Sequence, residues 1–228
     1  MKKVSLVLGS GGARGYVHIG VIETLEARGY EIVSVSGCSM GALVGGVYAC
    51  GKLAEYKAWV QGLEPLDVTS LLDLAWDKRG IMSGSKVFER LDELIGTQTI
   101  EGLPIRFTAV ASDLNLGKEV WFQSGDLLTA IRASVAARYS SFAERLASKA
   151  KNAIKERLRR QEQAHIFSIL DQSFDTMQRS LTQYRIGGYP PDIMITLPKN
   201  ICSTFDFHKA AMLIEAGRRA VEEHPALR

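Results

Sequence analysis

A serine set between glycines is the feature of this sequence best suited to chemistry. Residues 37–41 read Gly-Cys-Ser-Met-Gly, which is the pattern G-x-S-x-G. An apolar run precedes it and small apolar residues follow it, so we predict a strand, a tight turn and a helix. Such a turn lifts the serine Oγ above the sheet, at a helix N-terminus that favours developing negative charge. We interpret Ser39 as the nucleophile of a serine acyl hydrolase, with Gly37 and Gly41 completing the nucleophile elbow; the alternative is a plain tight turn.

A second glycine-rich loop, residues 9–15, follows another short apolar run. Glycines after a first strand can bind a dinucleotide pyrophosphate, but here Arg14 stands where the third glycine of that fingerprint is required. The acidic residue expected about 20 positions later is also missing, because the second strand leads into the serine turn.

The other interpretation of this loop is an oxyanion hole. The backbone amides of Gly11, Gly12 and Ala13 would point at a substrate carbonyl oxygen, and glycine allows the close approach that this requires. Two glycine loops on neighbouring strands, one of them with a serine, favour an acyl hydrolase over a nucleotide site.

The elements that must position these loops indicate an α/β fold. Residues 4–8 are predicted to form a buried parallel strand and residues 32–36 a second strand, while 17–28 and 41–50 have helical character. This order predicts a central, mostly parallel sheet with helices on both faces. Further along, we expect helices over 53–96, 126–136, 141–185 and 207–223, and strands at 105–111, 119–123 and 192–197.

Composition restricts the class of protein. The 228 residues are 46% hydrophobic and 23% charged, which suits one globular domain over 1–228. A net charge of +3 gives no support for a nucleic-acid partner. Cys38, Cys50 and Cys202 have neither metal-ligand spacing nor a disulfide pattern, so we expect no metal and a reducing, cytoplasmic location.

At these motifs the chain resembles the patatin-like phospholipases. Residues 10–15 match their loop G-G-G-x-[R/K]-G, with Ser10 in place of the first glycine, and residues 37–41 match their elbow. Similar segments lie at 18–21, 111–114, 130–134, 190–193 and 206–208, and the resemblance covers about 3–136 and 165–224. It implies a three-layer patatin-like sandwich, a Ser–Asp dyad without a catalytic histidine, lipid acyl-ester substrates and no cofactor.

One part of the family pattern is missing. The family's catalytic aspartate lies in Asp-Gly-Gly or Asp-Gly-Ala, and no Asp-Gly dipeptide occurs in the sequence. A segment of the natural chain is missing, the chain has been shortened by a deletion, or the protein is a naturally inactive member. We expect the first, with the junction near residues 136–141. Asp113 ends a predicted strand and is a weaker candidate base, since a structural hydrogen bond to a turn explains it as well.

Several other residues have a functional and a structural interpretation. His18 follows the oxyanion loop, but the resemblance implies no histidine base, so we expect a packed or capping residue. Arg14 orients the oxyanion loop, meets an anionic head group or forms a structural ion pair. The stretch from Trp59 to Trp76 is an acyl-chain wall, a lid or ordinary core. The basic stretch 145–160 is a solvated helix face or contacts anionic lipid at the inner face of the membrane.

Two other functions remain open at this stage. The first is a catalytically inactive regulatory or scaffold protein with a patatin-like fold, which a true lack of the aspartate motif would favour. The second is a nucleotide-binding protein. The sequence leaves a homo-oligomer open, and it leaves the head group and the acyl-chain length undetermined.

Overall fold

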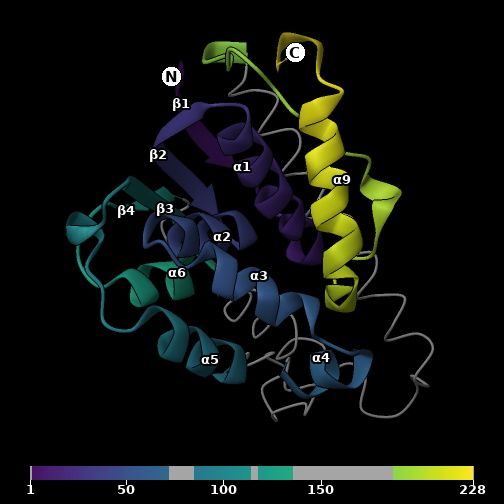
Figure 1. The fold of residues 1–228 in the computed structure, drawn as a ribbon. Coiled ribbons are helices and arrows are strands. Elements are labelled where there is room, and N and C mark those ends of the chain that lie inside the picture. Colours follow the sequence, from purple (N-terminus) through teal and green to yellow (C-terminus); the bar gives the residue numbers. More distant parts are fainter. Residues whose placement is uncertain (1, 72–84, 114–117, 136–186, 228) are drawn as a thin grey trace, which may run out of the picture. The chain divides into compact units, whose positions relative to one another are not determined.

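The computed structural model describes residues 2–71, 85–113, 118–135 and 187–227. The chain divides into two compact units, one of residues 1–142 with 196–228 and the other of residues 143–195. All helices and strands named below belong to the first unit (Figure 1).

A four-stranded mixed sheet forms the centre of this unit, in the order β1-β2-β3-β4. Strands β1 (Lys2–Leu8), β2 (Tyr30–Cys38) and β3 (Arg106–Asp113) are parallel, and β4 (Lys118–Phe122) runs antiparallel to β3. The register pairs Leu8 with Gly37 and Gly37 with Ala109. The loop after β1 and the turn after β2 therefore leave the sheet at the same edge, which is where parallel α/β sheets place their sites.

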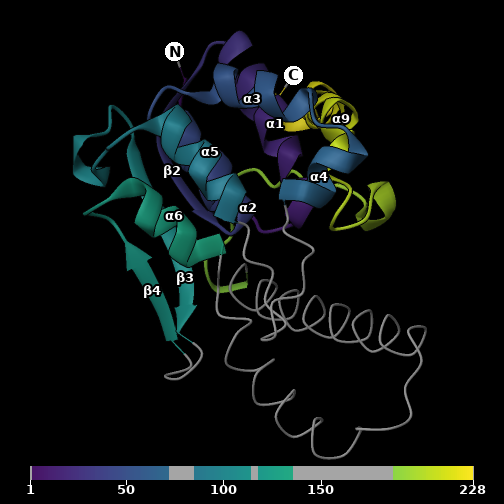
Figure 2. The ribbon, with the colours of Figure 1, turned by 90° about the horizontal axis from the view of Figure 1, so that it is seen from below.

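Seven α-helices accompany the sheet in the part of the chain that the structure describes (Figures 1 and 2). They are α1 (Val17–Ala27), α2 (Met40–Ala49), α3 (Leu53–Gln61), α4 (Pro65–Leu71), α5 (Ser85–Ile95), α6 (Leu127–Val135) and α9 (Ala210–Glu222). Short 3₁₀ helices occur at Gly12–Tyr16, Ile100–Gly102, Lys199–Ile201, Phe207–Lys209 and Pro225–Leu227. The mixed sheet flanked by helices confirms the predicted α/β class, and the strand–turn–helix order around Ser39 is as expected.

Helix α2 packs on the sheet through its small residues. A Cβ on Gly45 would lie 2.7 Å from the Val35 side chain and 3.4 Å from that of Leu8, and one on Gly46 would lie 2.6 Å from Ile131 of α6. All ten residues of α2 are buried. The uncharged sequence of this helix is thus explained by burial between the sheet and neighbouring helices.

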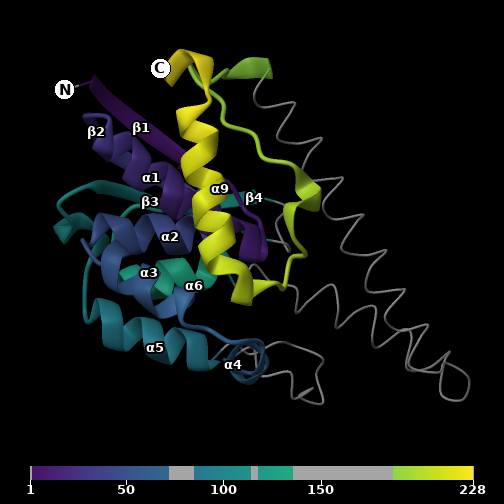
Figure 3. The same ribbon diagram turned by 45° about the vertical axis from the view of Figure 1, so that its right-hand side comes forward.

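Helices α1 and α9 cross in close contact, although they come from opposite ends of the sequence (Figure 3). A Cβ on Gly20 would lie 1.9 Å from the Ile214 carbonyl oxygen, and one on Gly217 would lie 2.0 Å from the Val17 carbonyl oxygen. At the far end of α1, Arg28 Nη1 donates to the carbonyl oxygens of Val221 (3.1 Å) and Leu227 (2.6 Å).

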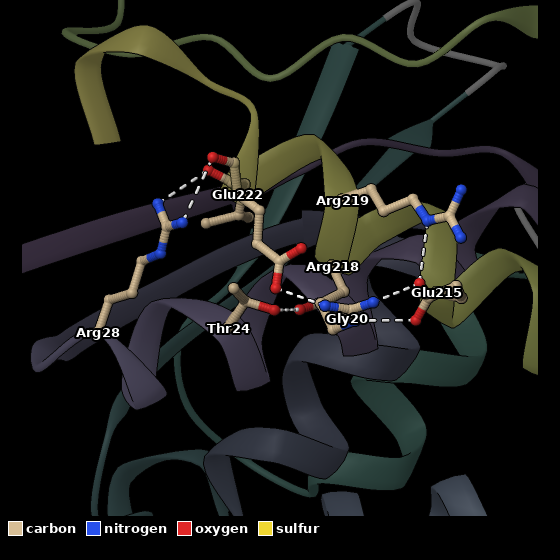
Figure 4. Close-up of polar contacts among 8 residues, drawn as sticks. Gly20, Thr24, Arg28, Glu215, Arg218, Arg219 and Glu222 are labelled. Atoms are coloured by element: carbon tan, nitrogen blue, oxygen red, sulfur yellow. Dashed lines mark hydrogen bonds and ion pairs between the residues drawn. The ribbon is translucent and has the colours of Figure 1, made fainter. Parts of the chain in front are cut away.

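Figure 4 shows this crossing, with the Arg28 guanidinium directed at the end of α9. Arg218 forms ion pairs with Glu215 and Glu222 along the exposed side of α9. The C-terminal helix is therefore fixed to the helix that follows the first glycine loop.

Two predictions about strands are wrong. Residues 4–8 were expected to be buried, but β1 pairs on one side only within the described sheet, and Val7 is 84% exposed. Residues 192–197 form no strand. Their apolar run is short, and a run of this kind becomes a strand only where the tertiary fold supplies a partner for its backbone.

The predicted helix 207–223 is observed as a 3₁₀ turn continuing into α9. The predicted long helix at 141–185 lies outside the described residues. Within those residues, no helix is both long enough and apolar enough to cross a bilayer.

Candidate functional site

Ser39 has the backbone conformation of a nucleophile elbow. Its φ is 52° and its ψ is −123°, and it is the only non-glycine residue with positive φ in the described ranges. Such a conformation is strained for an L-residue and persists only where the surroundings enforce it. The Ser39 carbonyl oxygen accepts the Leu43 N–H at 3.0 Å, so the serine stands at the start of α2.

The two flanking glycines are required by space. A Cβ on Gly37 would lie 2.4 Å from the Gly41 carbonyl carbon, and one on Gly41 would lie 2.1 Å from the Leu8 carbonyl oxygen. The G-x-S-x-G pattern therefore follows from the packing of this turn against the end of β1. The same contact brings the elbow beside the first glycine loop.

Ser134 of α6 is hydrogen-bonded to the backbone of the elbow. Its Oγ accepts the Ser39 backbone N–H at 2.9 Å and donates to the Val110 carbonyl oxygen of β3 at 2.6 Å. The sequence analysis included Ser134 in a segment that resembles the family, 130–134, but gave it no role at the site. A signal was present, because 127, 130, 131 and 134 form one buried stripe of α6 in which Ser134 is the polar member.

The first glycine loop lies against the elbow. A Cβ on Gly15 would come within 2.4 Å of Met40 Cβ, which leaves no room for a side chain there. Gly12 has a φ of 54°, and its missing side chain makes room for Thr204, whose carbonyl oxygen would be 2.5 Å from a Cβ. The loop is thus enclosed between the elbow and the segment around Thr204.

The backbone amides of the loop are not equivalent. The Ala13 N–H donates to the Thr204 carbonyl oxygen at 2.8 Å, whereas the amides of Gly11 and Gly12 donate to no residue in the described part of the chain. The expectation that Ala13 offers a free amide is therefore wrong for this conformation. The reason is a contact with a segment distant in sequence, which the local pattern does not reveal.

Arg14 fixes the loop from its outer side. Its Nε donates to the Gly11 carbonyl oxygen at 3.3 Å, and its Nη2 donates to Thr204 Oγ1 at 3.1 Å. These bonds support the interpretation in which Arg14 orients the glycine loop. Thr204 is a second site-forming residue that the sequence did not indicate.

His18 anchors the start of the same loop. Its Nε2 lies 2.9 Å from the Gly9 carbonyl oxygen, and because a carbonyl only accepts, this nitrogen is the donor. Burial lowers the pKa of His18, and the bond to Gly9 partly offsets this. The geometry agrees with a packed, loop-anchoring histidine and not with a base directed at Ser39.

Other sequence candidates have less direct relations to the elbow. Asp113 ends β3 opposite Lys118, on the same sheet edge as the elbow. Burial raises the pKa of Cys38, the residue before Ser39, and a hydrogen bond from the nearby Ser10 amide acts in the opposite direction. Within the described ranges, no three His, Cys, Asp or Glu side chains are grouped as metal ligands.

A hollow of about 460 Å³ lies beside α3 and α4 and is lined by Trp59, Gly62, Leu63, Asp67, Ser70 and Leu71. The rings of Trp59 and Tyr56 meet edge to face (centroids 5.7 Å apart), and Tyr56 contacts Tyr16, which directly follows the glycine loop (6.4 Å). Trp59, from the stretch interpreted as an acyl-chain wall, a lid or ordinary core, is thus partly buried against the core and lines a surface hollow.

Three other predictions fall outside the described residues: Trp76, the junction at 136–141 and the basic stretch 145–160.

Comparison with known proteins agrees with this geometry. The family model "Patatin-like phospholipase" matches residues 6–140. An "Uncharacterized NTE family protein" of Mycobacterium tuberculosis and its counterpart in Mycobacterium bovis are each 52% identical to the chain over 134 residues. The match covers 59% of this chain and 37% of each relative, so the chain spans 37% of their length.

A human relative, "Patatin-like phospholipase domain-containing protein 6", is 29% identical over 137 residues, which are 58% of this chain and 10% of the relative. The family match spans more than half of the chain and includes both glycine loops and Ser134. The chain belongs to the patatin-like phospholipase family.

Proposed function

We propose that this protein is a serine hydrolase that cleaves carboxylic esters of lipids, of the phospholipid or lysophospholipid type, with Ser39 as the nucleophile. The observation that supports this most directly is the strained backbone of Ser39 between β2 and α2. A positive φ at a serine costs about 1–3 kcal/mol and is typical of residues held for a function. Membership of the patatin-like phospholipase family supports a lipid ester as substrate.

In the proposed reaction, Ser39 Oγ attacks the ester carbonyl carbon and forms a tetrahedral intermediate. Two amides near the site are already used, since Ser39 N–H binds Ser134 and Ala13 N–H binds Thr204. This supports Gly11 and Gly12 as the oxyanion donors. The intermediate then collapses to an acyl-enzyme, with release of the alcohol, and water hydrolyses the acyl-enzyme to free the acid. The N-terminus of α2 favours the negative charge that develops at the serine.

The base in this proposal is an aspartate, as in a Ser–Asp dyad. It takes the serine proton, returns it to the leaving alcohol, and then activates water. The sequence contains no Asp-Gly dipeptide. We therefore assign the aspartate to a segment of the natural chain missing near residues 136–141.

The lack of that motif also favours a second candidate: a catalytically inactive regulatory or scaffold protein of the same fold. The two are separated by activity. We expect the protein to hydrolyse a p-nitrophenyl ester and to bind a fluorophosphonate probe covalently at Ser39, as read by peptide mass spectrometry. Ser39→Ala should abolish both, while Ser124→Ala, at an exposed serine, should leave both unchanged.

Full ester turnover by Ser39→Ala would refute the assignment of the nucleophile. A wild-type chain that is folded but neither turns over ester nor binds the probe would favour the inactive protein. An intact mass of the natural protein above 25.0 kDa would support the missing segment.

We also propose a cytoplasmic protein that contacts the inner face of the membrane through the basic stretch 145–160. Each lysine or arginine close to an anionic leaflet contributes about 1 kcal/mol to the free energy of membrane binding. Co-sedimentation with vesicles should increase with their phosphatidylserine content. Equal binding to neutral and anionic vesicles would rule this contact out.

A further inference from the structure

We infer that Ser134 is a positioning residue, which holds the backbone of Ser39 in the conformation that presents its hydroxyl. The inference deepens the proposed function, because it assigns the origin of the elbow's conformation to one buried hydroxyl on another helix.

The first observation is the hydrogen-bond relay itself. Ser39 N–H donates to Ser134 Oγ at 2.9 Å, and Ser134 Oγ donates to the Val110 carbonyl oxygen at 2.6 Å. A hydroxyl has one proton to donate and lone pairs to accept, so both bonds form at once. Alanine at position 134 can form neither bond, so Ser134→Ala leaves the Ser39 N–H and the Val110 carbonyl oxygen without this partner.

The second observation is the rigidity of the support. Ser134 is 2% exposed, and Ile131, one turn earlier on the same face of α6, is fully buried against Gly46 of α2. Asp126 Oδ1 accepts the Thr129 N–H at 2.7 Å and caps the start of α6. The hydroxyl therefore approaches the elbow from a helix that is fixed at its cap and along its buried face.

The third observation is what the relay connects. Val110 pairs with Cys38, the residue before the nucleophile, in the parallel ladder of β2 and β3. The ladder fixes the chain up to Cys38, and the relay fixes the next amide, at the point where φ becomes positive. Ser134 thus fixes the residue that follows the β2–β3 ladder, where the strained turn begins.

The relay also has a chemical consequence. Because Ser39 N–H is bound to Ser134, the nucleophile's own amide is not an oxyanion donor here. If the bond is lost, the turn can relax and this amide can compete for the carbonyl oxygen. Ser134 therefore acts on both the direction of Oγ and the choice of amides that meet the oxyanion.

The test compares Ser134→Ala with Ser134→Thr, which keeps the hydroxyl, and with Thr24→Val. Thr24 is a matched control, since its buried hydroxyl bonds to the Gly20 carbonyl oxygen at 2.7 Å at the crossing of α1 and α9, away from the elbow. Amide hydrogen exchange at Ser39 is measured by NMR, together with the rate of fluorophosphonate labelling and the split of ester turnover into kcat and KM.

In Ser134→Ala we expect the Ser39 amide to exchange about 10- to 100-fold faster and labelling and kcat to fall by a similar factor, with KM little changed. Ser134→Thr should restore most of the protection of the Ser39 amide, of the labelling rate and of kcat. Thr24→Val should lower the melting temperature without altering exchange at Ser39, labelling or kcat. If Ser134→Ala does not fold, Ser134→Cys takes its place, with intermediate values expected because a thiol is a weaker donor and acceptor.

The inference is overturned if Ser134→Ala leaves exchange at Ser39 unchanged, or if Thr24→Val reproduces its effects. Failure of the proposed function has a different result. A wild-type chain without labelling or turnover would refute the hydrolase, whereas amide exchange at Ser39 would still decide whether Ser134 holds the elbow.

Discussion

The carbonyl oxygen of Thr204 accepts the backbone N–H of Ala13 at 2.8 Å, and the Thr204 hydroxyl accepts from Arg14 at 3.1 Å. One residue from the C-terminal part of the chain thus fixes two consecutive residues of the first glycine loop. The contact uses the Ala13 amide, so this amide is not free to bind another acceptor.

Gly12→Ala tests this contact. The new Cβ would lie 2.5 Å from the Thr204 carbonyl oxygen at a φ of 54°, so the loop and Thr204 must separate. We expect a loss of about 1–3 kcal/mol in the free energy of unfolding and a large fall in ester turnover. Urea denaturation and p-nitrophenyl ester kinetics measure the two. Gly9→Ala is the control, because a Cβ there meets nothing within 4 Å; equal effects of the two changes would contradict the role of Thr204.

Stability should depend on pH through His18. The ordinary pKa of histidine is about 6.5, and burial lowers that of folded His18. Between the two values the unfolded chain binds more protons, so acidification favours unfolding. We expect the contribution of His18 to be fully present above about pH 6.5 and to be lost as the pH falls below it.

The measurement is the free energy of unfolding between pH 5 and 8 for the wild type and for His18→Gln. Glutamine retains a donor for the Gly9 carbonyl oxygen but does not titrate. The variant should have a flatter profile on the acidic side. Identical slopes for the two proteins would show that His18 does not contribute.

The crossing of α1 and α9 should not tolerate a side chain at its centre. A Cβ on Gly217 would lie 2.0 Å from the Val17 carbonyl oxygen, which belongs to a helix backbone and has little freedom to move. Overpacking commonly costs about 1–3 kcal/mol, and this contact is with helix backbone, so we expect Gly217→Ala to destabilise the fold by about 3 kcal/mol, at the upper end of that range. Thermal unfolding is the measurement.

Gly62→Ala is the matched substitution for this prediction. Gly62 ends α3 with a φ of −87°, and its nearest contact to a new Cβ is an ordinary 3.5 Å. It should change the melting temperature little. A Gly217→Ala protein as stable as Gly62→Ala would show that the two helices separate easily.

The three cysteines should react slowly in the folded protein. Burial is the largest cause that raises the pKa of each of Cys38, Cys50 and Cys202, so less thiolate is present at a given pH. At pH 8, iodoacetamide should modify each cysteine more slowly in native buffer than in urea, as followed by peptide mass spectrometry. Equal rates in both solvents would contradict the burial of Cys202 and the partial burial of Cys38 and Cys50.

Much of the fold could be predicted because its signals are local. The apolar runs at β2 and β3, the helix periodicity of α1 and the uncharged helix α2 are properties of short segments, and the structure has these elements with slightly different ends. The exposed side chains of β1 and the missing strand at 192–197 were predicted wrongly. Both depend on which other segments lie beside the backbone, and short apolar runs do not contain that information.

For the candidate site, the sequence by itself determined the two glycine loops and Ser39. A turn this tight excludes side chains at Gly37 and Gly41. Because these glycines and Ser39 lie within five consecutive residues, the pattern can be recognised in the sequence. Only the tertiary structure decided the support of the site: Ser134 bonded to the elbow, Thr204 bonded to the glycine loop, and the Gly11 and Gly12 amides left without an acceptor among the described residues. Those relations are hydrogen bonds between segments far apart in the chain, and such bonds exist only once the sheet and its helices have brought the segments together.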